Sequence, residues 1–177
     1  MIFLYQLLTY FLYPFLNIYL LYRKLKKKEH PTRYKEKLSK ISLSKNKGFL
    51  IWFHVASVGE SLSILPLVKK LEKEKKIQTI LITSITLSSA SVLKNRFFNS
   101  KKIIHQFMPL DVPILIKKFL NHWSPKIAIF IDSEIWPNTI FEIKKRNIPL
   151  LLINARITKR TFNKWQLLKN FSKKIFQ

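Results

Sequence analysis

Five short apolar runs alternate with longer amphipathic stretches from residue 49 onward. The runs have strand length and are Phe49–His54, Ile77–Thr83, Ile103–Phe107, Ile127–Asp132 and Pro149–Asn154. The stretches with helical spacing are Ser61–Lys75, Ser88–Phe98, Pro113–Trp123, Pro137–Arg146 and Thr158–Phe176. Nearly continuous hydrophobic strands are typical of a parallel sheet covered by helices on both faces. Right-handed crossovers between such strands predict an α/β, Rossmann-like domain.

Ligands of such a domain bind beyond the carboxyl ends of the strands, so the loops that follow the five runs are the candidate functional segments. None of these loops has the pattern G-x-G-x-x-G or G-x-x-x-x-G-K-[ST], and the whole chain has only 2 Gly. Because both phosphate cradles need closely spaced glycines, a dinucleotide site or a P-loop is not expected.

The segment Ile2–Tyr22 contains no charged residue. As a helix it is about 31 Å long, which is close to the hydrocarbon thickness of a bilayer. A basic block follows, comprising Arg23, Lys24, Lys26, Lys27 and Lys28. By the positive-inside rule this block favours the cytoplasmic side for the residues after it. Because Pro14 interrupts the apolar run, its composition leaves three arrangements open: a spanning helix, a monotopic helix and a core helix of a soluble protein.

These patterns divide the chain into a membrane anchor with its basic flank (1–28), a polar linker (29–48) and one α/β domain (49–177). The formal net charge is +24, which suits an anionic membrane surface or a nucleic acid, or reflects a skewed coding composition. No nucleic-acid recognition motif accompanies the charge, so no nucleic-acid partner is expected. With no Cys and four scattered His, no metal site is expected either.

The loop after the first run carries Gly59 and Glu60 in the sequence HVASVGE. A glycine at a strand-to-helix turn permits a positive φ or the close approach of a ligand. Glu60 at the helix start is stabilised by the helix dipole and suits a general base. A glutamate that only caps free helix amides fits the same position equally well.

Acidic residues also close the fourth run, where Asp132 and Glu134 precede Trp136 and Pro137. We expect both to lie at the same sheet edge as Glu60, which would bring three of the nine acidic residues together. The alternative is that one of them caps a helix or pairs with Arg156 of the fifth loop.

Further polar residues follow the second and fifth runs. Arg156 could bind a phosphate or a carboxylate bidentately, and Asn154 precedes it. Ser84 and Thr86 offer hydroxyl groups that suit sugar contacts, although helix capping is the more common role of such residues.

At these loops the sequence resembles the Kdo transferases, which add 3-deoxy-D-manno-octulosonic acid (Kdo) to a lipid A precursor. The resemblance spans nearly the whole chain. It includes the N-terminal anchor followed by the segments HVASVGE, ITSITLSSA, FMPLDVP, SEIWPN and NARIT in family order.

This resemblance implies the N-terminal, acceptor-binding half of a GT-B glycosyltransferase at the cytoplasmic face of a Gram-negative inner membrane. Its acceptor would be lipid IV-A and its donor CMP-Kdo, with no further cofactor. Glu60 then corresponds to the general base of an inverting transfer. In the family a Glu stands where this chain has Asp132, and the resemblance implies that this carboxylate helps to stabilise the transition state. Glu134 is expected to share that role with Asp132 or to take it over.

The other residues assigned to substrate binding through the resemblance are Ser57, Gly59, Ser84, Thr86, Asn154 and Arg156. Family members continue into a donor-binding domain, which is not within these 177 residues. The expectation is therefore a truncated form that does not transfer Kdo by itself. The alternative function is a non-catalytic module that binds acidic glycolipid at the membrane surface.

Overall fold

The computed structural model describes residues 2–41, 43–132 and 134–155, together with 159, 162, 163 and 166. Its centre is a parallel five-stranded sheet in the order β3-β2-β1-β4-β5. The strands are β1 (Phe49–Val55), β2 (Ile77–Ser84), β3 (Ile103–Phe107), β4 (Ile127–Ile131) and β5 (Leu150–Ile153). All five coincide with the predicted apolar runs to within one residue at each end, and the α/β, Rossmann-like class is confirmed.

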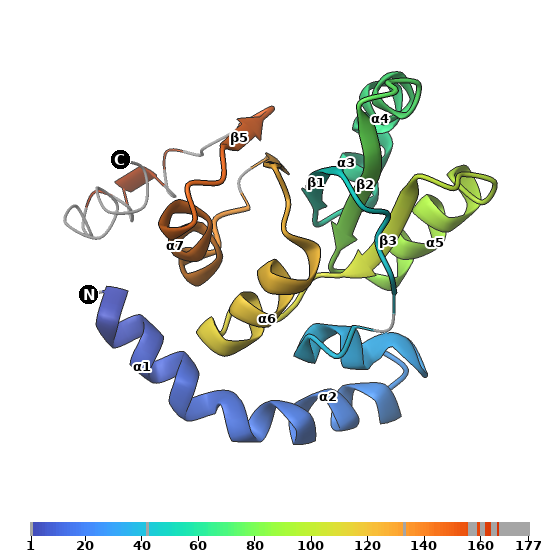
Figure 1. The fold of residues 1–177 in the computed structure, drawn as a ribbon. Helices are drawn as coiled ribbons and strands as arrows, with labels where there is room; N and C mark the ends of the chain where they lie inside the picture. The colour runs from blue at the N-terminus through green and yellow to red at the C-terminus, as the bar shows by residue number, and fades with distance from the viewer. Residues whose placement is uncertain are drawn as a thin grey trace.

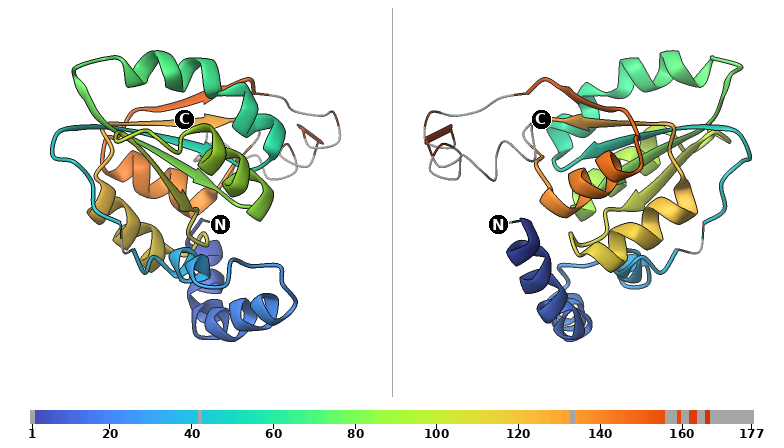
Figure 2. Two further views of the ribbon diagram at one scale, coloured as in Figure 1. Left: turned by 90° about the vertical axis from the view of Figure 1, so that its right-hand side faces the viewer. Right: turned by 60° about the vertical axis from the view of Figure 1, so that its left-hand side comes forward.

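Helices connect the strands and cover both faces of the sheet (Figures 1 and 2). They are α3 (Val58–Ser63), α4 (Leu65–Glu72), α5 (Leu87–Arg96), α6 (Pro113–Trp123) and α7 (Pro137–Lys145). The single helix expected over Ser61–Lys75 is wrong in one respect, because the segment starts earlier and divides at Ile64. Pro66 explains the division, since it has no N–H to continue the hydrogen bonds of the first helix. The helix predicted at Thr158–Phe176 lies largely outside the described residues.

The side chains of the sheet alternate between two apolar layers, one on each face. On one face Trp52, Leu81 and Phe130 pack against Phe119 of α6 and Ile143 of α7. On the other face the core includes the following residues of β1, β2, α4, α5 and the junction before α4: Phe53, Val55, Ile64, Val68, Ile80, Ile82 and Leu93. Because both layers are buried, the strands are predominantly apolar on both faces, as the sequence pattern indicated.

The N-terminal helices form a bent arc along the α6 and α7 side of the domain (Figure 1). The arc consists of α1 (Ile2–Leu12), the 3-10 turn η1 (Tyr13–Phe15) and α2 (Leu16–Leu25). Pro14 lies in the 3-10 turn, where its missing N–H changes the helical hydrogen-bond pattern. Leu20 is buried with Leu115 of α6, so the arc packs against the domain.

A second 3-10 helix, η2 (Arg33–Leu38), follows the arc and packs beside β3. Glu36 accepts a hydrogen bond from the backbone N–H of Phe107 at 2.8 Å and two from Arg33. Lys37 is buried beside Glu29, with 2.7 Å between its Nζ and Oε2. These buried charges are paired, which offsets their desolvation.

Candidate functional site

The carboxyl ends of β1 and β4 lie next to each other, because His54 of β1 is in register with Phe130 of β4. Glu60 lies in the first turn of the helix that follows β1, and Glu134 lies in the loop after β4. The observed strand order thus places the strand exits that precede the acidic residues side by side, as expected for this sheet edge. Neighbouring strand ends of a parallel sheet are where ligands of this fold class bind.

Glu60 belongs to the first turn of α3 and forms a reciprocal cap with Ser57. The Ser57 hydroxyl accepts from the backbone N–H of Glu60 at 3.2 Å and donates to Glu60 Oε1 at 2.7 Å. The backbone N–H of Ala56 donates to Glu60 Oε2 at 2.7 Å. These contacts confirm that Glu60 caps the start of α3. Its side chain is still partly exposed, so its carboxylate is accessible to a ligand.

Gly59 is exposed at the second position of α3. Its φ is not positive, so the interpretation that this glycine supplies a left-handed turn is wrong. A Cβ at Gly59 would meet only Ser57 Oγ, at 3.9 Å. The geometry therefore permits the other interpretation, in which a ligand closely approaches the backbone at Gly59.

Glu134 lies beside a fully buried histidine. Its Oε2 is 3.7 Å from His54 Nε2 and accepts a hydrogen bond from Trp136 Nε1 at 2.9 Å. The pKa of Glu134 is lowered below its ordinary value, chiefly by the interaction with His54 and against the opposing effect of burial. Glu134 is therefore ionised at neutral pH.

Asp132 occupies a different environment from Glu134. Its φ is +61°, a left-handed conformation that Asp tolerates better than most residues, and its backbone N–H donates to the carbonyl of Ile153 at 2.9 Å. Its carboxylate has no hydrogen-bond or ion-pair partner among the described residues. Asn154, also at positive φ, is exposed at the end of β5. Arg156 lies outside the described residues, so its expected pairing with an acid has no structural counterpart here.

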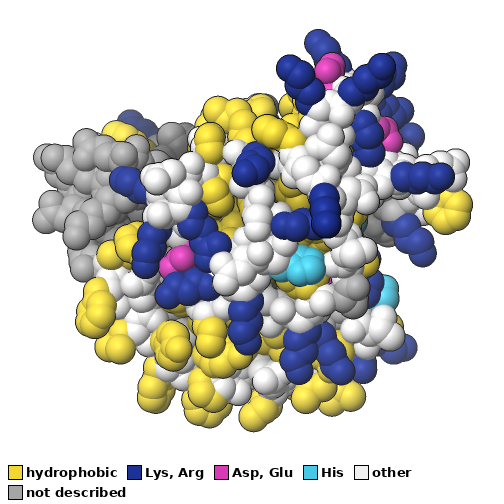
Figure 3. Space-filling view, viewed as in Figure 1, with side chains coloured by type: hydrophobic (Ala, Val, Ile, Leu, Met, Phe, Trp, Pro, Cys, Tyr) yellow, Lys and Arg dark blue, Asp and Glu magenta, His cyan; other side chains and the backbone are white. Residues whose placement is uncertain are grey.

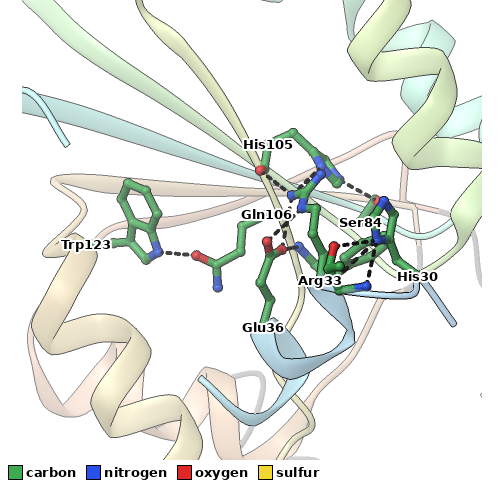
Figure 4. Close-up of polar contacts among 9 residues, drawn as sticks. His30, Arg33, Glu36, Ser84, His105, Gln106 and Trp123 are labelled. Carbon is green, nitrogen blue, oxygen red and sulfur yellow. Dashed lines mark hydrogen bonds and ion pairs between the residues drawn. The ribbon is translucent and has the colours of Figure 1, made fainter. Parts of the chain in front are cut away.

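The residues after β2 are mostly engaged within the fold. Thr86 is the N-cap of α5, and its hydroxyl accepts from the backbone N–H of Ser89 at 3.1 Å, which confirms the capping role. Ser84 is fully buried, with its Oγ 2.9 Å from His105 Nε2. Figure 4 shows that Arg33 approaches the other side of the same imidazole from η2.

Sequence reasoning did not assign a role to His54. It is the last-but-one residue of β1, with Nδ1 2.9 Å from Thr83 Oγ1 and with no exposed surface. A polar residue inside a strand that is otherwise apolar was the available signal. The partner of that residue could not be read from the sequence, because Glu134 is 80 positions away.

The five-stranded parallel sheet, with acidic residues after β1 and β4, defines an α/β domain whose candidate site lies at the exits of these two strands. Residues 32–177 match the family described as 3-deoxy-D-manno-octulosonic-acid transferase (kdotransferase). The chain therefore belongs to the Kdo transferase family.

Individual relatives show the same similarity. A probable mitochondrial 3-deoxy-D-manno-octulosonic acid transferase of Arabidopsis thaliana is 38% identical over 162 residues, covering 92% of this chain and 36% of that protein. The 3-deoxy-D-manno-octulosonic acid transferase of Rickettsia bellii is 40% identical over 182 residues, covering 98% of this chain and 43% of that protein. That of Haemophilus influenzae is 35% identical over 119 residues, covering 67% and 27%. The chain thus spans less than half the length of these relatives.

Among the described residues, one helical segment, Ile2–Leu25, is long and apolar enough to cross a membrane. Length and composition alone are weak evidence, since core helices and signal sequences pass the same test. The segment is little buried, and its exposed apolar residues recur at helical spacing: Phe3, Leu4, Leu7, Leu8, Phe11, Phe15 and Ile18. Figure 3 shows hydrophobic side chains gathered along the lower edge of the molecule, where Figure 1 places α1 and α2, with Lys and Arg side chains beside them.

Proposed function

We propose that these residues form the acceptor-binding half of a glycosyltransferase that transfers Kdo from CMP-Kdo to lipid IV-A. The observation that carries the proposal is the Glu60 carboxylate, held at the exit of β1 beside the acidic exit of β4. The family membership supplies the reaction class. We assign the donor nucleotide to a second half of the enzyme, corresponding to the length of the relatives that this chain does not cover.

Glu60 acts as the general base in this proposal. The acceptor sugar hydroxyl attacks the anomeric carbon of CMP-Kdo, the bond to CMP breaks, and the hydroxyl proton passes to the carboxylate, so the anomeric configuration inverts. Each carboxylate oxygen can accept more than one hydrogen bond, so Oε1 can receive a sugar hydroxyl in addition to the Ser57 hydroxyl. The contacts from Ala56 and Ser57 hold the base in one orientation before the acceptor arrives.

The acceptor occupies the exposed side of the same edge. Ser57, Gly59, Thr86 and Asn154 are exposed there and are the described residues that we assign to sugar contacts, with Arg156 as a further candidate. Ser84 is buried beneath them and supports the exit of β2 through His105. The missing Cβ of Gly59 leaves room for the sugar against the first turn of α3.

The Ile2–Leu25 segment holds this edge at the cytoplasmic surface of the membrane as a monotopic helix. Its inward side is joined to the domain by polar contacts: Tyr5 donates to Asp111 at 3.1 Å, and Asn138 Nδ2 donates to Thr9 at 3.2 Å. A spanning helix would have to break these contacts or draw Asp111 into hydrocarbon, which is costly. The outward apolar side and the basic flank of Arg23 and the following lysines suit insertion into an anionic leaflet instead.

The catalytic assignment is tested with Glu60→Gln in a chain that carries both halves of the enzyme. We expect transfer to lipid IV-A to fall by about 100-fold or more, as for loss of a general base, while acceptor binding is retained. Glu74→Gln is the matched control, because Glu74 is an exposed glutamate near the start of β2, at the opposite end of that strand. Transfer by Glu60→Gln at the rate of the control would remove Glu60 from this role.

The membrane assignment is tested by vesicle co-sedimentation of Phe11→Ser and Phe15→Ser. Each change removes apolar surface that would be buried in the leaflet, so we expect about a 5- to 10-fold weaker partitioning into vesicles with anionic lipid. Phe98→Ser is the matched control, because Phe98 is at least as exposed as Phe11 and Phe15 but lies after α5, outside the arc. Equal partitioning of all three variants would contradict a membrane contact through α1 and α2.

A further inference from the structure

His54 is held rigidly beneath the exit of β1. Its side chain is fully buried, and Thr83 of β2 fixes the ring through the 2.9 Å contact between Oγ1 and Nδ1. The same Thr83 oxygen accepts a hydrogen bond from Trp52 Nε1 at 2.8 Å. The rings of Phe130 and Trp136 approach the imidazole edge-on, with centroids at 5.2 and 6.0 Å. The orientation of this imidazole is therefore determined on several sides.

The outer nitrogen of this ring is not satisfied within the described part of the chain. Nε2 is buried without a hydrogen-bond partner there, and the 3.7 Å to Glu134 Oε2 exceeds hydrogen-bond distance. Buried polar atoms without partners are uncommon and costly, so one that faces a candidate site requires an explanation. Among the described residues, His54 is also the one titratable group within ion-pair distance of Glu134.

The protonation of the pair follows from the carboxylate. An ionised Glu134 opposite Nε2 requires a proton on that nitrogen, because a bare lone pair would repel it. Thr83 permits this in both charge states of the ring. Its hydroxyl proton can point to Nδ1 of a neutral imidazole or to the carbonyl of Phe53, 3.2 Å away, when Nδ1 is protonated.

Trp136 and His54 both face one oxygen of Glu134. Oε2 faces His54 Nε2 and receives the indole N–H of Trp136, whereas Oε1 has no hydrogen-bond partner among the described residues. The side chain is 24% exposed. One oxygen is thus anchored to the fold and the other is available to a ligand. Asp132 lacks any such anchoring among the described residues.

We propose that His54 is a positioning residue that orients Glu134 through Nε2, and that Glu134 rather than Asp132 supplies the second carboxylate of the transfer site. This inference rests on the proposed function. Glu134 accepts a hydrogen bond from a sugar hydroxyl through Oε1, while Glu60 takes the proton from the attacking hydroxyl. Two carboxylates in different environments then perform different tasks at one sheet edge.

The first test follows the Glu134 carboxyl by ¹³C NMR as the pH of this chain in detergent micelles is lowered. We expect His54→Phe to raise the titration midpoint of Glu134 by about one pH unit or more, because the opposite donor is lost. His54→Gln keeps an N–H donor and should restore part of the shift. His105→Gln is the matched control, since His105 is a strand histidine bonded to Ser84 and Arg33 instead of Glu134.

An unchanged midpoint in His54→Phe would overturn the proposal. The wild-type chain offers a second measurement that does not depend on a variant folding, because ¹⁵N shifts of the His54 ring report which nitrogen is protonated. A proton on Nε2 near neutral pH is the expected result. A ring protonated at Nδ1 alone would contradict the assignment.

The second test compares Glu134→Gln and Asp132→Asn in the enzyme that carries both halves. We expect the loss of kcat/KM for lipid IV-A to be about 10-fold larger in Glu134→Gln, and His54→Gln to retain more activity than His54→Phe. A larger loss in Asp132→Asn would overturn the assignment of the second carboxylate. If the wild-type enzyme forms no product, the proposed function fails, whereas the NMR result still decides whether His54 controls Glu134.

Discussion

At the exits of β2 and β3, the side chains of Ser84 and Asp111 have hydrogen-bond partners inside the fold, as does His105 within β3. At the exits of β1 and β4, the Asp132 carboxylate and His54 Nε2 have none among the described residues. We call the first set the closed half of the edge and the second, with Glu60 and Glu134, the open half. Among the described residues Gln106 Nε2 of β3 is also buried without a partner, so the open half is distinguished by unpaired groups that lie with the carboxylates of Glu60 and Glu134. There a ligand is expected to complete the hydrogen bonding.

The two strand histidines, His105 of β3 and His54 of β1, differ in the same way as the two halves of the edge. Arg33 Nη2 can only donate, so Nδ1 of His105 accepts its hydrogen bond at 3.1 Å and the ring proton lies on Nε2, facing Ser84. Burial, followed by the charge of Arg33, lowers the pKa of His105 to about 3. This histidine is neutral and structural, whereas His54 faces a carboxylate.

The largest effect is expected in the closed half, at Asp111. Its carboxylate accepts the backbone N–H of Asn138 at 3.0 Å and that of Thr139 at 2.8 Å, so it caps α7 from the loop after β3. Asp111→Ala leaves both amides without partners and releases Tyr5, so we expect a loss of about 3 kcal/mol in the free energy of unfolding. Chemical denaturation measures this loss. Asp111→Asn keeps one acceptor oxygen and should lose less, and a loss below about 1 kcal/mol in Asp111→Ala would contradict the capping role.

Thr83→Val probes the support beneath the open half. The isosteric change removes the hydroxyl that accepts from Trp52 Nε1 and is hydrogen-bonded to His54 Nδ1, and both partners are fully buried, so we expect a loss of about 2–3 kcal/mol in the free energy of unfolding. Thr79→Val is the matched control on the same strand, because the buried Thr79 hydroxyl has no hydrogen-bond partner among the described residues. That control should be neutral or stabilising. Equal losses in the two variants would show that the Thr83 hydroxyl carries no special role.

His105 adds a pH dependence that belongs to the closed half. Its pKa is about 3 in the folded chain and about 6.5 when unfolded, so between these values the unfolded chain binds more protons. The contribution of His105 to the free energy of unfolding is complete above pH 6.5 and is lost as the pH falls toward 3. His105→Gln should reduce that pH dependence, by on the order of 1–3 kcal/mol across the window, in denaturation series at fixed ionic strength. If the difference in the free energy of unfolding between the wild type and His105→Gln does not change with pH, the lowered pKa of His105 is contradicted.

The smallest effect is expected for Ser84→Ala. The change removes the acceptor of the His105 Nε2–H and should cost about 1 kcal/mol in the free energy of unfolding. Ser88→Ala on the exposed side of α5 is the matched control and should change stability by less than about 0.5 kcal/mol. If the two variants are equally stable, the closed half does not depend on the Ser84 hydroxyl.

Much of the architecture was predictable from local patterns. The five apolar runs defined the strands because burial on both faces makes most positions of a parallel strand apolar. The helix predicted from Ser61 was misjudged in its start, at Val58, and in its continuity, where Pro66 changes the hydrogen bonding. The Ile2–Tyr22 segment was equally visible as an apolar helix. Its arrangement was not, because the choice between spanning and lying along the domain depends on partners such as Asp111, more than 100 residues away.

The site shows the same division between sequence and tertiary structure. Sequence by itself determined that Glu60, Asp132 and Glu134 follow strands whose carboxyl ends share an edge, because the crossovers make the strands parallel, whereas the order that sets β1 beside β4 came from the structure. Only the tertiary structure decided which acid is anchored. His54 and Glu134 come from different strands, and the approach of their atoms depends on the register of β1 with β4 and on the packing of Trp136, neither of which is encoded in the spacing of the residues along the chain.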